Sequence, residues 1–144
     1  THSTADTTDS SAAAVKIGTE IAGVGISAAF SKTDKSTHSL NNLAGGASKL
    51  YTEAWWNIGK VAAANTVDDI TALNITIEVG GFGLYATSTD TGKEYNDMKE
   101  AVLTYKIPVG NFEATMAYVY EDLQESKDKS NTDTRIQAYL VYSF

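Results

Sequence analysis

The chain has 144 residues, which suits one domain and leaves no room for a second sizeable core. Hydrophobic residues make up 42% and charged residues 20%, which excludes a disordered chain, and the absence of cysteine excludes disulfides and thiolate metal sites. The formal net charge of −7 excludes a dominant phosphate-binding surface, so we expect no nucleic-acid partner.

No transmembrane helix is predicted, because such a helix needs about 20 consecutive apolar residues. Polar residues interrupt every apolar stretch of this chain. The first residues carry neither the basic region nor the apolar core of a signal peptide. We therefore expect a mature form or part of a longer protein. Counting back through the alternating turns and loops described below, we expect residues 1–14 to be an external polar loop.

Short segments of alternating polarity follow in pairs, and a period of two indicates β-strands. Residues 15–22 and 24–31 form the first predicted hairpin, and residues 71–79 and 82–87 form the second around Gly80-Gly81. Residues 32–70 between them are predicted to be a long external loop.

Three further strands are predicted in the C-terminal part. Residues 100–108 and 112–123 are joined by Val109-Gly110-Asn111, and residues 135–144 form the last strand. Tight turns thus alternate with the longer polar connections 32–70, 88–99 and 124–134. Transmembrane barrels of bacterial outer membranes have this asymmetry.

The fold class expected is therefore all-β, a single antiparallel transmembrane β-barrel segment over residues 1–144. Seven strands are an odd number, whereas barrels favour even numbers. We therefore expect an N-terminal part to be missing, and the family resemblance described below implies that this chain is the C-terminal portion of a larger barrel of about 16–18 strands. An eighth strand hidden in residues 49–58 is the alternative.

A soluble sandwich or ligand-binding barrel also alternates, and alternation alone favours it. Two features favour the membrane instead. The less apolar faces are small or mixed rather than rich in Lys and Glu. Aromatic residues gather on the apolar faces near the strand ends, as lipid-interface residues do. These aromatics are Phe30, Phe82, Phe112, Tyr118, Tyr120, Tyr142 and Phe144.

The last strand, residues 135–144, resembles the C-terminal signal of outer-membrane barrels. Phe144 ends the chain, and Tyr142, Leu140, Ala138 and Ile136 occupy every second position before it. The resemblance implies that the barrel assembly machinery reads this strand. It also implies a place in the outer membrane of a Gram-negative bacterium, in contact with its lipid.

Residues 51–57, Tyr-Thr-Glu-Ala-Trp-Trp-Asn, and the hairpins after them resemble the C-terminal third of the major outer-membrane porins of Campylobacter-type bacteria. Those are OprD-like barrels of about 18 strands that assemble as trimers. The resemblance implies a homotrimeric porin for passive diffusion of ions and small hydrophilic solutes. The alternative function is a small structural or adhesive outer-membrane barrel whose external loops bind a partner.

A porin needs charged side chains around a wet lumen and a narrowing that sets solute size. The predicted pore-lining residues alternate with the apolar ones and carry both signs: Lys16, Glu20, Glu78, Lys106, Glu113 and Arg135. Each could equally be a solvated or ion-paired side chain. Trp55 and Trp56 are candidates for a loop constriction, although packing against protein is the favoured interpretation of such a pair.

Catalysis and metal binding have little support in the sequence. His2 and His38 lie in polar segments without an evident partner, so we expect no enzyme. No cofactor is expected, and Ca²⁺ is the one candidate metal. Asp68 and Asp69, with Asp6 and Asp9, are its candidate ligands, but the spacing fits no Ca²⁺ loop and a solvated acidic loop is favoured.

Overall fold

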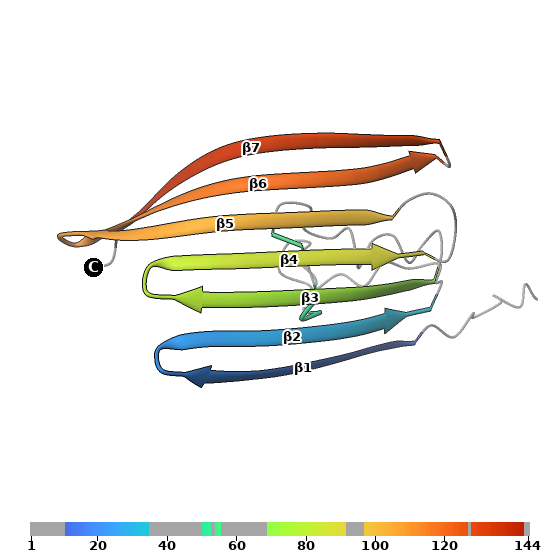
Figure 1. Ribbon diagram of the computed structural model, residues 1–144, viewed down its shortest axis with the longest axis horizontal. Helices are drawn as coiled ribbons and strands as arrows, with labels where there is room; N and C mark the ends of the chain where they lie inside the picture. The colour runs from blue at the N-terminus through green and yellow to red at the C-terminus, as the bar shows by residue number, and fades with distance from the viewer. Residues whose placement is uncertain are drawn as a thin grey trace, which may run out of the picture.

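The computed structural model describes residues 11–34, 50–52, 54–55, 69–91, 97–126 and 128–142. Most of these residues form one antiparallel sheet, and the described residues contain no helix. Each strand pairs with the next one along the chain (Figure 1). The strands are β1 (Ala12–Ile21), β2 (Val24–Thr33), β3 (Ile70–Val79), β4 (Phe82–Asp90), β5 (Met98–Val109), β6 (Phe112–Ser126) and β7 (Lys129–Tyr142). The described part of the chain holds no helix that is long and apolar enough to span a membrane.

The seven predicted strands are confirmed, and the alternative of an eighth strand is not supported. Residues 50–52 and 54–55, the described part of that candidate strand, adopt turns, a bend and irregular backbone. Their strand-like sequence signal comes from aromatic residues, which are common in strands but also in packed loops.

The three tight turns lie at one end of the sheet, as Figure 1 shows on the left. Ala22 and Gly23 both have positive φ, of 52° and 77°, as a type I′ hairpin turn requires. Gly80 and Gly110 have positive φ at the first turn position, which is the type II′ pattern. Primed turns match the twist of the flanking strands, so each hairpin closes with two residues.

The other end of the sheet differs from the prediction. The predicted loop 124–134 is wrong, because β6 continues to Ser126 and β7 already begins at Lys129. Residues 88–99 likewise contribute to β4 up to Asp90 and to β5 from Met98. The alternation of apolar and polar residues did not indicate these extensions, because polar residues lie on both of their faces. Strands can pair there because the hydrogen bonds between their backbones do not depend on side-chain polarity.

The register assigns every predicted apolar position in β1 to β7 to the same side of the sheet, here called the outer face. One row across all strands reads Thr19, Ile26, Ile77, Leu84, Leu103, Tyr118 and Ile136. The opposite side is called the inner face, and it holds nearly all the buried side chains. The apolar side of this sheet is therefore the exposed one.

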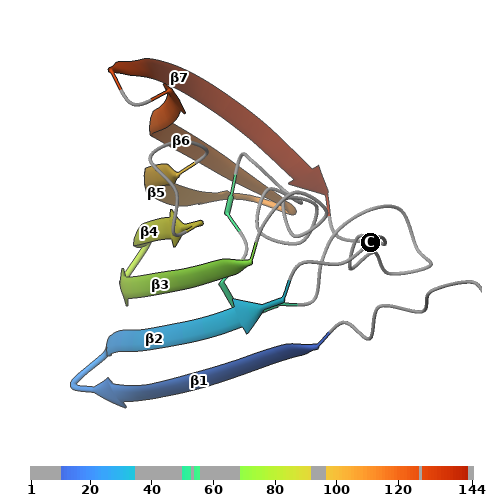
Figure 2. The ribbon, with the colours of Figure 1, turned by 90° about the vertical axis from the view of Figure 1, so that its right-hand side faces the viewer.

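A short segment, residues 50–52 and 54–55, lies against the inner face and is called the strap. Figure 2 shows the sheet twisting and bending, with the strap in green on one side of it. The first and last strands, β1 and β7, each pair on one side only within the described residues. β5 continues past Tyr105, the partner of Phe82, to Val109, so the turns of successive hairpins are staggered.

Candidate functional site

The inner face carries mostly polar or small side chains in three central rows, with Val102 and Val119 as the apolar exceptions. The first row is Lys16, Ala29, Asn74, Thr87, Glu100, Glu121 and Asp133. The second row is Gly18, Ser27, Thr76, Tyr85, Val102, Val119 and Arg135. The third row is Glu20, Gly25, Glu78, Gly83, Thr104, Ala117 and Gln137. This surface is the candidate site, because it gathers ion pairs and side-chain hydrogen bonds of the sheet.

The strap covers part of this face through four contacts. The Thr52 and Ser31 hydroxyls lie 2.6 Å apart, and both residues are fully buried. Leu50 packs against Ile70 and Ala72. The Trp55 ring lies 4.9 Å from the Tyr85 ring and packs on the cluster of Val102, Ala117 and Val119.

The fourth contact joins the strap to β5. The Trp55 backbone N–H donates to Glu100 Oε1 over 2.6 Å. Glu100 is only 3% exposed, so the bond forms in a place from which water is largely removed. A carboxylate acceptor makes it a charge-assisted hydrogen bond, roughly twice as strong as a neutral one.

Glu100 is the direct cross-strand partner of Glu121, which is 2% exposed. Two neighbouring buried carboxylates repel each other unless each has a partner. Arg135 of β7 supplies one, since its Nη1 lies 2.8 Å from Glu121 Oε2 while its Nη2 contacts Asp133. One guanidinium therefore bridges two acids of the first row.

Tyr85 links the strap to the third row. Its ring lies across Gly83, where a Cβ would come within 2.8 Å of the ring. Its hydroxyl donates to Glu78 Oε1 over 2.8 Å. The missing side chain at Gly83 thus makes room for a ring that contacts both Trp55 and Glu78.

All six predicted pore-lining residues lie on the inner face of the sheet. The structure brings Arg135 to Glu121 and Glu78 to Tyr85, as described, and the other four are exposed: Lys16, Glu20, Lys106 and Glu113. The prediction missed Glu100, Glu121, Asp133 and Tyr85 as site residues. Their alternation with the apolar positions was the available signal.

The predicted aromatic residues of β2, β4, β6 and β7 lie on the outer face. Phe82 stacks with Tyr105 at 4.4 Å between ring centroids, and Phe112 contacts Tyr142 at 4.9 Å. Both pairs lie toward the turn end of the sheet. Phe144 and Trp56, which completed the predicted sets, lie outside the described residues.

Divalent-cation ligands are not gathered anywhere in the described segments, where no group of three or more His, Cys, Asp or Glu side chains could hold a metal. Asp69 is exposed, whereas Asp6, Asp9 and Asp68 lie outside those segments.

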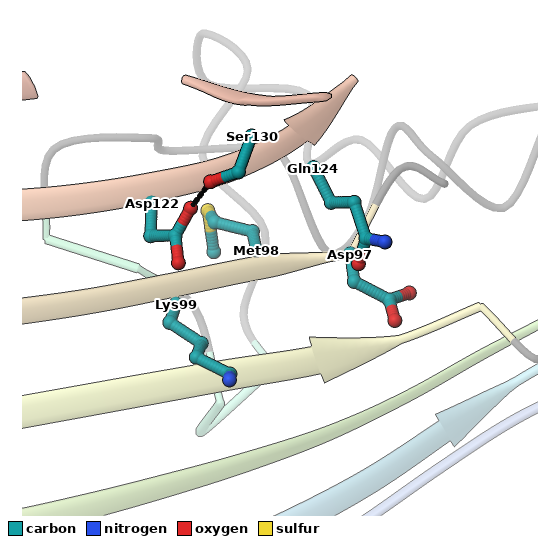
Figure 3. Close-up of a pocket in the computed structure, with 6 residues that line it drawn as sticks. All are labelled: Asp97, Met98, Lys99, Asp122, Gln124 and Ser130. Carbon is teal, nitrogen blue, oxygen red and sulfur yellow. Dashed lines mark hydrogen bonds between the residues drawn. The ribbon is translucent and has the colours of Figure 1, made fainter. Parts of the chain in front are cut away.

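The hollow shown in Figure 3, of about 60 Å³, has two carboxylates in its lining. Asp122 accepts from Ser130, and Asp97 accepts from Thr91 over 2.9 and 3.0 Å. Both carboxylates thus accept hydrogen bonds from within the chain.

No protein-family model matches this chain, and no curated protein or solved structure is significantly similar to it. Function is therefore inferred from its own residues and their geometry.

Proposed function

We propose that this chain is part of the wall of an outer-membrane porin, a channel for passive diffusion of ions and small hydrophilic solutes. The observation that carries the proposal is the exposure of the apolar face. Leu103 is 50% exposed, Met116 52% and Leu140 66%, and similar residues continue across all seven strands. Soluble monomers rarely leave a continuous apolar surface of this extent in water, whereas lipid covers it at no cost.

The inner face has the complementary composition. Its three central rows hold five carboxylates and two cations: Glu20, Glu78, Glu100, Glu121 and Asp133 against Lys16 and Arg135. Glu100 and Glu121 are buried, so the carboxylates that face the path are Glu20, Glu78 and Asp133, which still outnumber the two cations. Acidic excess along a water-filled path raises the local concentration of cations. A preference for cations over anions is therefore part of the proposal.

The open edges of β1 and β7 give the reason for a larger barrel. An unpaired strand edge cannot stay exposed in lipid, because each unsatisfied backbone group costs several kcal/mol there. Strands outside this chain's described part would close the sheet, and the staggered turns fit the tilt of barrel strands. The total of about 16–18 strands, the homotrimer and the recognition of β7 by the barrel assembly machinery belong to the same proposal.

Planar-bilayer recording of the full-length protein tests the function. Stepwise currents in three equal sublevels, with a reversal potential shifted toward the cation equilibrium potential in a salt gradient, are expected. A silent bilayer, with protein that is correctly folded and inserted, would contradict the porin. It would leave the structural or adhesive barrel as the remaining explanation of the exposed apolar face.

A further inference from the structure

The strap is held on the inner face by buried side chains and by contacts with several strands. Thr52 is fully buried and Ala54 is 4% exposed, so the strap packs tightly on the inner face. Its contacts reach β2 through Ser31, β3 through Ile70, β4 through Tyr85 and β5 through Glu100. At least four strands therefore fix its position.

Glu100 makes the one of these contacts in which a side-chain oxygen of the sheet accepts a hydrogen bond from the strap backbone. Without the carboxylate, the Trp55 N–H would lose its acceptor in a largely dry site, which costs more than the loss of an ordinary surface hydrogen bond. The contacts of Leu50 and Thr52 lie on β2 and β3, so they would not replace it, and of the described contacts only the packing of the Trp55 ring would remain at that end.

We propose that Glu100 is a positioning residue that latches the Trp55 end of the strap to the inner face, and that the latched strap sets the width of the aqueous path. The Trp55 ring then stays on Tyr85 and occupies space beside the acidic rows. Loss of the latch lets that end of the strap move away from the inner face. The aqueous path then becomes wider and its width fluctuates more. The second half of this inference rests on the proposed pore, whereas the latch itself does not.

Fluorescence tests the latch without any current. In a Trp56→Phe background Trp55 is the only tryptophan, since the chain has two. Glu100→Ala is expected to raise the acrylamide quenching constant of the inserted protein by about twofold, because local release exposes the ring. Glu100→Gln keeps an oxygen acceptor for the N–H and should quench like the parent. Glu113→Ala, an equal loss of charge on the exposed inner face of β6, should also quench like the parent.

Single-channel recording tests the width. Glu100→Ala should increase conductance and open-channel noise, and Glu100→Gln should not. The chain has no cysteine, so Ser31→Cys with Thr52→Cys places a single reducible disulfide across the 2.6 Å hydroxyl contact. Added to Glu100→Ala, this disulfide should leave the raised conductance unchanged before and after dithiothreitol, because it fixes the Thr52 end of the strap and not the Trp55 end. A return to the parent conductance would contradict a latch at the Trp55 end.

The outcomes separate the two claims. Equal effects of Glu100→Gln and Glu100→Ala would mean that charge alone matters, and would overturn the latch. Unchanged quenching in Glu100→Ala would overturn it too. If Glu100→Ala shows the expected quenching but an unaltered conductance, only the width-setting role is refuted. If the parent protein itself carries no current, the pore and the width-setting role are both refuted, while the latch stands.

Discussion

Gly83 and Gly25, both in the third inner row, differ in whether their surroundings leave room for a side chain. A Cβ at Gly83 would lie 2.7 Å from Thr104 Oγ1, closer than such atoms approach in folded proteins. A Cβ at Gly25 would meet nothing nearer than 3.8 Å, at Glu78 O. Only Gly83 is therefore required by its surroundings, where it accommodates the Tyr85 ring.

Gly83→Ala should lower the free energy of unfolding by about 1–3 kcal/mol, because the extra methyl displaces Tyr85 and Thr104. Gly25→Ala on the same row should stay within about 0.5 kcal/mol of the parent. Urea unfolding midpoints in detergent micelles or bilayers measure both. Equal effects of the two substitutions would contradict the packing of Tyr85 on Gly83.

Arg135 stabilises the fold by pairing with the buried carboxylate of Glu121. Arg135→Met leaves the carboxylate of Glu121, 2% exposed, without the guanidinium. The expected loss of stability is about 1–3 kcal/mol, less than for a fully buried pair because the Arg135 side chain is 32% exposed. Lys106→Met makes a comparable change at an exposed inner position and should cost little. The same unfolding measurement compares them, and a larger loss at Lys106 would refute the role of the ion pair.

At the scale of elements, the β1–β2 turn is the least ideal of the three. Ala22 has a φ of 52°, in a region that alanine occupies at a cost and asparagine tolerates better. Ala22→Asn should therefore stabilise the protein by about 0.5–1 kcal/mol, whereas Ala22→Val should destabilise it. Refolding and unfolding midpoints would reveal the difference, and a stabilising valine would contradict the turn geometry.

Hydrophobic alternation was sufficient to predict all seven strands and the face on which their apolar residues lie. It failed at the loop end of β6 and β7, where Ser130, Thr132 and Thr134 pair with β6 although neither face is apolar. The strap contact could not be predicted either. Trp55 and Glu100 are 45 residues apart, and only the folded sheet brings them together.

At the scale of the whole molecule, the outer face is the decisive surface. Leu103→Lys puts a charge in the middle of its apolar rows and should destabilise the protein in a bilayer by about 2–4 kcal/mol. Thr132→Lys, on the same face near the loop end of β7, should cost about 0–1 kcal/mol. Folding yield and unfolding midpoint in lipid vesicles measure both. A harmless Leu103→Lys would mean that this surface faces water.

Spin labels along β7 test the contact with lipid most directly, since every residue from Ile136 to Val141 is at least partly exposed and the chain has no native cysteine. Labels at Ile136, Ala138 and Leu140 should collide preferentially with oxygen dissolved in the lipid. Labels at Gln137, Tyr139 and Val141 should collide preferentially with a water-soluble nickel chelate. This alternation with a period of two is the predicted result. Chelate access at all six positions, or exclusion of both reagents from the first three, would contradict a wall between lipid and water.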